Sequence, residues 1–141
     1  MGSLQGGFTL IELMIAIAVI GIILAIAIPG LRSSRKSSNE ASAVASLKAL
    51  TSANEQYKAR FVRYAGTLRN LSQTKFIDSV LGSGTKSGYS FTYAGGANTW
   101  TTRASPVLAG STGDRGFFVN QTGVIRFTPS GNAKATSPPV D

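Results

Sequence analysis

The stretch GGFTLIELMIAIAVIGIILAIAIPG, residues 6–30, decides the fold of this 141-residue chain because it is almost wholly apolar. Residues 13–28 contain no charged or hydrogen-bonding side chain, and residues 8–28 together make 21 positions. About 20 apolar residues are needed to cross the hydrocarbon core of a bilayer as a helix. Soluble helices are rarely apolar on every face over this length. The stretch therefore predicts a membrane helix, and Glu12, a carboxylate near its start, needs an explanation.

Three interpretations of this helix differ in how they treat Glu12. A removable secretory signal would end in a small-x-small cleavage site, which residues 25–27 supply, but it would follow a basic segment, and residues 1–7 hold no Lys or Arg. A plain anchor explains the length but leaves the carboxylate without a partner, although charges in membrane helices are usually paired and functional. In the third interpretation the chain is cut between Gly7 and Phe8.

The third interpretation gives Glu12 a partner. The cut would create an α-ammonium on Phe8, one helical turn from Glu12, where free backbone N–H groups and the helix dipole also favour an anion. Between two helices packed side by side, the new N-terminus of one would meet Glu12 of the other and fix their axial offset. Glu12 is then an assembly residue.

These same residues, Gly-Phe-Thr-Leu-Ile-Glu followed by a spanning run and a proline, resemble the N-terminus of type IV pilins and of type II secretion pseudopilins. The resemblance implies that a prepilin peptidase/methyltransferase cleaves after Gly7 and N-methylates Phe8, and that Glu12 pairs with a neighbouring N-terminus. It identifies Pro29 with the helix-loosening proline of the family. It implies as partners further copies of the chain in a helical filament, and an inner-membrane assembly platform with a motor ATPase.

The resemblance also implies a location. The precursor would lie in the bacterial inner membrane with its N-terminus cytoplasmic and its C-terminal part outside, and would assemble into an extracellular pilus or a periplasmic pseudopilus. Charge alone favours the opposite orientation, because the first basic residues, Arg32, Arg35 and Lys36, follow the span and cytoplasmic flanks are usually positive. We follow the more specific motif, and a truncated or replaced leader would explain the missing positive charge.

A second helical pattern follows Pro29 and Gly30 and runs to Tyr64. Its side chains recur at steps of three and four residues, which is typical of an amphipathic helix. The stripe comprises Val44, Leu47, Leu50, Asn54, Tyr57, Phe61 and Tyr64. Gly21, Pro29 and Gly30 are expected weak points of the whole helix, either as a mild kink or as a stretch that unwinds in an assembled fibre.

The remaining residues predict a small antiparallel sheet. Residues 89–93 alternate aromatic and polar side chains, residues 99–104 make the return strand, and residues 117–119 and 124–127 make a second hairpin. A short helix is expected around residues 76–81. The aromatic side chains of these strands are expected in the core rather than around a ligand.

The expected fold class is therefore α+β: a long N-terminal α-helix, transmembrane in its first half and amphipathic in its second, packed on an antiparallel sheet of three or four strands. The expected segments are a leader at 1–7, a transmembrane and assembly segment at 8–29, an amphipathic segment at 30–65, a loop and sheet at 66–129, and a flexible tail at 130–141.

The composition argues against enzyme chemistry. The chain has no Cys and no His, which excludes Ser-His-Asp and Cys-His catalysis. We expect no catalytic residue, no cofactor and no metal. Asp114 is the one plausible nucleus of a calcium site, but carboxylates are too few and too scattered to predict one.

The chain carries a formal net charge of +8, and basic surfaces attract nucleic acid. An exposed fibre would bind DNA if several basic residues gathered on one face. Ordinary solvation, or charge complementarity with neighbouring subunits, is the alternative. The residues concerned are Arg60, Arg63, Arg69, Lys75, Lys86, Arg103, Arg115 and Arg126.

Together these observations favour a structural subunit of a type IV pilus. A minor pilin or a type II secretion pseudopilin is the alternative within the same family. A soluble exported binding module, released after Ala27, is the alternative outside it.

Overall fold

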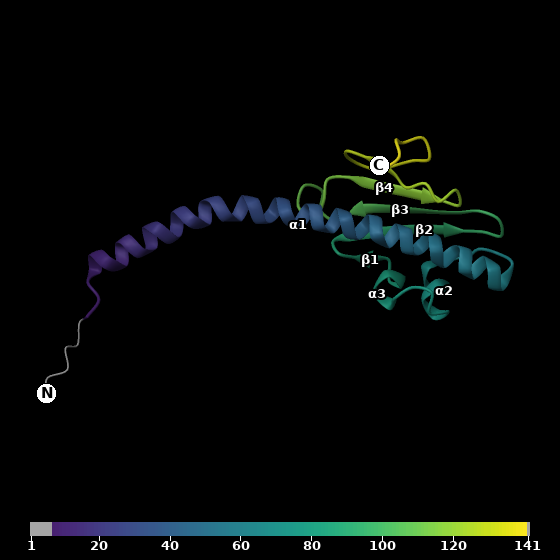
Figure 1. Ribbon diagram of the computed structural model, residues 1–141, viewed down its shortest axis with the longest axis horizontal. Helices are drawn as coiled ribbons and strands as arrows, with labels where there is room; N and C mark the ends of the chain where they lie inside the picture. The colour runs from purple at the N-terminus through teal and green to yellow at the C-terminus, as the bar shows by residue number, and fades with distance from the viewer. Residues whose placement is uncertain (1–6, 141) are drawn as a thin grey trace, which may run out of the picture. The chain divides into compact units, whose positions relative to one another are not determined.

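The computed structural model describes residues 7–140, and its first element is one long helix (Figure 1). Helix α1 spans Leu10–Phe61, 52 residues, and runs through Pro29 without a break. The chain divides into two compact units, residues 1–34 and residues 35–141. The first part of α1 belongs to one unit, and its second part belongs to the other, which we call the globular unit.

The globular unit combines helices with a five-stranded sheet, so the α+β class predicted from the sequence is confirmed. Two short helices, α2 (Leu68–Gln73) and α3 (Ser79–Gly82), follow α1. The sheet is antiparallel throughout and has the order β1-β2-β3-β4-β5. Its strands are β1 (Thr85–Lys86), β2 (Tyr89–Gly95), β3 (Trp100–Pro106), β4 (Gly116–Asn120) and β5 (Arg126–Thr128).

The core lies between the second part of α1 and one face of the sheet, across which α1 runs in Figure 1. Side chains alternate along a strand between its two faces, and in β2 and β3 the inward positions are the aromatic and small ones. The aromatic residues expected in the core are found there. Buried members of the cluster include Leu47, Leu50, Ala53, Tyr57, Tyr89, Phe91, Trp100, Phe117 and Val119.

Several details differ from the sequence-based expectations. The short helix expected around residues 76–81 spans Ser79–Gly82, because Asp78 caps its start. Helix α1 ends at Phe61 instead of reaching Tyr64, because Val62 takes a left-handed conformation (φ 59°) and turns the chain away. Residues 68–73 form a helix rather than a loop, since Thr67 and Asn70 make a reciprocal capping box. The sheet has five strands rather than three or four, because the two-residue strand β1 is too short to leave a pattern in the sequence.

The last residues, expected to form a flexible tail, pack on the sheet in two places: residues 131–133 approach the face opposite α1, and residues 138–140 hydrogen-bond along β5 and Ile125. Gly116 permits this close approach, because a Cβ at that position would collide with the carbonyl oxygen of Gly131. Phe118, which points away from the α1 side, is buried. The backbone N–H of Val140 donates to the carbonyl of Ile125 at 2.8 Å. The tail thus covers apolar surface that would otherwise face water.

Asn54, which interrupts the apolar stripe of α1, is fully buried and hydrogen-bonded. Its Nδ2 donates to the Leu50 carbonyl at 3.0 Å, and its Oδ1 lies 2.6 Å from the hydroxyl of Tyr93 on β2. The same hydroxyl lies 2.9 Å from the carbonyl oxygen of Ala65, in the loop after α1. At Gly95 a Cβ would collide with that carbonyl oxygen. One polar contact therefore joins helix, loop and sheet.

Replacing Tyr93→Phe should destabilise the globular unit. The change removes the hydroxyl and leaves Asn54 Oδ1 buried without a partner, which costs about 1–3 kcal/mol of unfolding free energy. Tyr57→Phe is the matched control, because the Tyr57 hydroxyl on the same helix takes part in none of the hydrogen bonds among residues 7–140. Chemical denaturation of the full chain in detergent measures both. Equal small effects would show that the Asn54 contact contributes nothing.

Candidate functional site

The first turn of α1 is closed by a capping box between Thr9 and Glu12. Thr9 Oγ1 accepts the backbone N–H of Glu12 at 3.3 Å, while Glu12 Oε2 accepts the Thr9 backbone N–H at 2.8 Å and the Thr9 hydroxyl at 2.7 Å. Such a box satisfies two backbone donors that a helix start leaves free. The Thr-x-x-Glu spacing signals it in a sequence, yet the sequence-based expectation gave Thr9 no role.

The predicted processing and assembly residues lie together at this end of the helix. Gly7 and Phe8 precede α1 in irregular chain, and the Phe8 side chain is 85% exposed. No atom lies within 4 Å of the place that a Cβ on Gly7 would occupy. Glu12 Oε1, unlike Oε2, makes no hydrogen bond with any described residue. The site therefore offers an accessible peptide bond and one unused carboxylate oxygen.

The apolar segment after this turn has no cover within its own chain. Its large side chains, from Leu10 to Leu31, are all exposed. Within the described residues, α1 is the one helix that is long and apolar enough to cross a membrane, and none of its most apolar window is buried inside the protein. Burial of apolar surface is the main favourable contribution to folding and association. For this segment, that burial must come from lipid or from further apolar helices.

Gly21, Pro29 and Gly30, the predicted weak points, lie farther along the same segment. The helix is continuous through all three. Pro29 has no N–H, so it leaves the carbonyl of Ala25 without its usual helical donor. Around Gly21 and Gly30 there is open space, with no atom within 4 Å of a built Cβ. Packing within one chain thus gives no reason for glycine at either position.

A second polar cluster, missed by the sequence analysis, fixes the loop between β3 and β4 to α1. Glu40 is buried and binds Arg115 through Oε2 (2.7 Å from Nε), while its Oε1 accepts the backbone N–H groups of Asp114 at 2.9 Å and Arg115 at 3.2 Å. Burial by itself raises the pKa of Glu40, but the Asp114 amide and then the Arg115 contacts outweigh it and hold the pKa below its ordinary 4.5. Seventy-five residues separate Glu40 from Arg115, and no sequence pattern links them.

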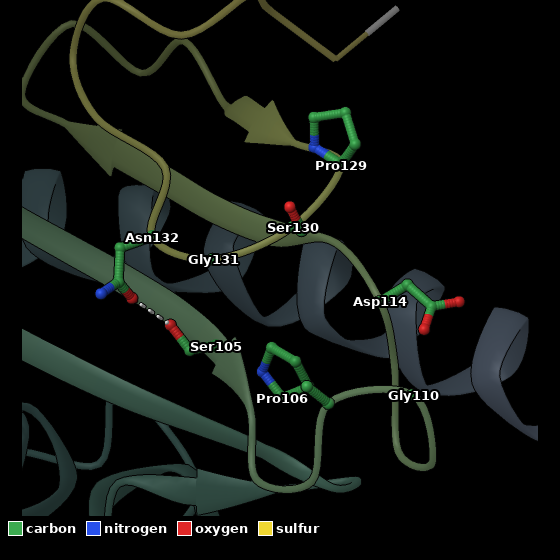
Figure 2. A pocket seen from close by; sticks show the side chains of 9 residues that line it. Ser105, Pro106, Gly110, Asp114, Pro129, Ser130, Gly131 and Asn132 are labelled. Carbon is green, nitrogen blue, oxygen red and sulfur yellow. Dashed lines mark hydrogen bonds between the residues drawn. The ribbon is translucent and has the colours of Figure 1, made fainter.

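Asp114, the candidate calcium nucleus, is engaged by Lys36 of α1 at 2.8 Å. It borders a hollow of about 510 Å³ between the β3–β4 loop and the tail. Figure 2 shows its carboxylate pointing away from Ser105 and Asn132, whose side chains hydrogen-bond to each other at 3.0 Å. Over the part of the chain that the structure describes, no three Asp, Glu, His or Cys side chains gather into a metal site. The hollow contains a single carboxylate, whereas calcium takes six to eight oxygen ligands.

Comparison with known proteins points to the same N-terminal segment. Residues 2–28 match the family described as the prokaryotic N-terminal methylation motif. The type II secretion system core protein G of Aeromonas hydrophila is 34% identical over 67 residues, 48% of this chain and 47% of that protein. The type IV major pilin protein PilA of Myxococcus xanthus (strain DK1622) is 46% identical over 59 residues, 42% of this chain and 27% of that protein. The type IV major fimbrial protein FimA of Dichelobacter nodosus is 76% identical over 29 residues, 21% of this chain and 19% of that protein. The chain thus spans less than half the length of each of these three relatives.

Glu40→Gln should lower the stability of the globular unit at neutral pH, by about 1–3 kcal/mol for the loss of charged hydrogen bonds. Because the folded pKa of Glu40 lies below the ordinary 4.5, its contribution is present above that pH and is lost as the pH falls through the folded pKa. The difference between wild type and variant should therefore shrink below about pH 4.5. Denaturation at several pH values measures it, with Glu55→Gln, an exposed glutamate outside the ion pairs among residues 7–140, as control. A pH-independent difference would contradict the pairing.

Proposed function

Because the chain belongs to the family of type IV pilins and type II secretion pseudopilins, we propose that it is a structural subunit of a type IV pilus. The observation that carries the proposal is a charged, capped first turn at the start of an apolar helix that its own chain leaves bare. Members of this family build filaments, so the role we propose is assembly and not catalysis.

In the proposed sequence of events, the precursor lies in the bacterial inner membrane with its N-terminus cytoplasmic. A prepilin peptidase/methyltransferase cuts after Gly7 and methylates Phe8. An assembly platform and its motor ATPase then move the subunit from lipid into a helical filament outside the membrane. There the apolar segment of each copy is covered by the same segment of its neighbours, so that helix–helix contacts replace lipid contacts.

The charge of Glu12 supports this proposal, because capping alone does not require a charge. Glutamine at the same position would also complete the capping box. An N-terminal cap contributes about 1 kcal/mol, whereas a carboxylate in the middle of a membrane helix costs about 2.5–3.5 kcal/mol and less towards its end. A neighbour's Phe8 ammonium at the unused Oε1 would offset that cost. The contact would exist only between assembled copies and would set their register.

The glycines and the proline of the same segment support a second part of the proposal. Since no described atom lies within 4 Å of a Cβ built at Gly21 or Gly30, we assign them to the filament, where residues 21–30 would unwind around Pro29 and let the fibre extend. Glycine lowers the cost of leaving the helix, and proline has already removed one hydrogen bond.

A pseudopilin of a type II secretion system is the second candidate, and the similarity to secretion protein G favours it. The two candidates differ in the product of assembly. A major pilin forms long surface fibres, whereas a pseudopilin or a minor pilin does not. Deleting the gene in its host and imaging the cell surface, together with an assay of secreted proteins, separates them.

The processing step predicts a defined N-terminus in the native host. Mass spectrometry of the mature chain should find methylated Phe8 as its first residue, and Gly7→Val should leave the precursor uncut because the peptidase cannot place a branched side chain there. Gly21→Ala, in the same segment but away from the bond, should be cut normally. A first residue at Ile28 would identify a released soluble module instead, and an uncut wild-type chain would identify a simple anchor.

Two substitutions separate the charge of Glu12 from its cap. Glu12→Gln keeps a capping acceptor but loses the charge, so the chain should be processed and inserted yet fail to form fibres. Thr9→Val keeps the charge but loses the cap, so fibres should persist with a modest loss of about 1 kcal/mol in helix stability. Electron microscopy of sheared fibres is the measurement. The reverse pattern would reduce Glu12 to a local cap.

A further inference from the structure

The residue just after the last turn of α1 is the one β-branched residue with a left-handed backbone in the described chain. Val62 follows the helix directly at φ 59°, and its N–H donates to the carbonyl of Lys58 at 2.8 Å. This is the αL way of ending a helix, in which glycine is the usual residue. Elsewhere among residues 7–140, glycine occupies five positive-φ positions, and Lys75 and Ser87 occupy two more. Valine is strained here, because its branched Cβ crowds the carbonyl oxygen.

The strained valine is exposed, and its neighbours in the sequence are exposed as well. Val62 is 86% exposed and Phe61 is 41% exposed, and Arg60 and Arg63, both exposed, flank them. Neither arginine belongs to an ion pair among residues 7–140. We call residues 60–63 the apical turn. It presents two apolar side chains between two arginines that lie outside the ion pairs. A glycine with polar neighbours would have ended the helix with less backbone strain and less exposed apolar surface.

The charges of the globular unit indicate that the partner of this turn is anionic and is not another copy of the chain. Of the four carboxylates described there, Glu40, Asp78 and Asp114 are each paired with a cation. Glu55, the fourth, accepts the hydroxyl of Tyr64. Among the described residues of a second copy's globular unit, Glu55 is therefore the one carboxylate outside an ion pair, against the two unpaired arginines of the turn.

The apolar pair favours lipid over nucleic acid. Protein side chains bind single-stranded bases by stacking on an open aromatic face. The ring of Phe61 is already approached by the Tyr57 ring, at 4.4 Å between centroids, and by the Arg60 guanidinium, at 5.5 Å. Val62 has no face on which a base could stack. Both side chains suit the boundary between headgroups and acyl chains, where apolar residues insert while arginines contact phosphates.

We propose that the apical turn docks on an anionic lipid surface, with Phe61 and Val62 inserted below the headgroups and Arg60 and Arg63 at the lipid phosphates. The binding is weak for each copy and falls as salt rises, since exposed charges are screened over about 8–10 Å at physiological ionic strength. The inference does not depend on fibre assembly. It would hold for a pilin, for a pseudopilin or for a single anchored chain.

The test uses the full chain in nanodiscs of neutral phosphatidylcholine, so that its own apolar segment is already covered. Binding to immobilised vesicles is compared between phosphatidylcholine alone and phosphatidylcholine with phosphatidylglycerol. The wild type should bind the anionic vesicles about ten-fold or more tightly than the neutral ones. Arg60→Ser with Arg63→Ser should remove that preference. Lys48→Ser with Lys134→Ser, which removes two exposed cations outside the turn, should keep it.

Val62→Gly separates docking from folding. Glycine relieves the strain, so the unfolding midpoint should rise, but the lost apolar side chain should weaken vesicle binding several-fold. Ser87→Gly, at another exposed positive-φ position (φ 48°), should change stability without weakening binding. A Val62→Gly chain that binds vesicles like wild type overturns the proposal.

Three further outcomes would also overturn it. An equal loss of binding in both double-serine variants would mean that net charge alone attracts the vesicles. Binding of duplex DNA that depends on Arg60 and Arg63, with no binding of anionic vesicles, would identify a nucleic-acid partner. Association of loaded nanodiscs with each other, lost in the Val62→Gly chain, would identify a second copy as the partner.

Discussion

An apolar helix surface that its own chain leaves uncovered is the constraint on which this protein depends. The buried core begins at Ala43 of α1, while the large apolar side chains from Leu10 to Leu31 are all exposed. The globular unit therefore closes its own core, and the N-terminal segment contributes nothing to it. A segment of this kind is stable only in lipid or packed against the same segment of other copies. Moving between these two environments costs little apolar burial, because lipid tails and neighbouring helices are similarly apolar. Polar contacts must then decide which environment is preferred, and the segment has one such group, Glu12.

Inside the globular unit, polar contacts have a different task, which is to fix α1 against the sheet. Glu40 and Asn54 are separated by 14 positions, about 21 Å along a helix and close to four full turns, so they lie on the same face. One binds the β3–β4 loop through Arg115 and two backbone N–H groups, and the other binds Tyr93 of β2. Apolar packing alone tolerates small slides of a helix along a sheet, whereas a buried polar pair is satisfied in one register. The two contacts therefore hold α1 at both ends of the core.

Much of this architecture could be predicted from the sequence, because local signals there agree with the fold. The apolar run, the period of the second half of α1 and the alternation in β2 each depend on neighbouring residues. The features that could not be predicted depend on contacts between residues far apart in the sequence or on a single backbone angle. No pattern joins Glu40 to Arg115, and nothing in the sequence shows that the helix ends before Val62 and does not reach Tyr64. The capping box of Thr9 and Glu12 is different, because the Thr-x-x-Glu spacing predicts it from sequence alone. It was missed because Glu12 was interpreted only as an assembly residue.

In the first turn of α1 and just after its last turn, the sequence carries a residue that is energetically less favourable there than another residue type would be. Glutamine would cap the start of the helix without bringing a charge into an apolar segment, and glycine would end it without strain at Val62. Less favourable residues at these two exposed sites indicate requirements from outside the single chain. The two requirements differ in kind. At Glu12 the missing element is a positive charge that the proposed cleavage of the chain would create. The turn at Val62 instead carries its own cations, and three of the four carboxylates described in the globular unit are already paired within it. The first site therefore points to self-assembly, and the second points to a chemically different surface.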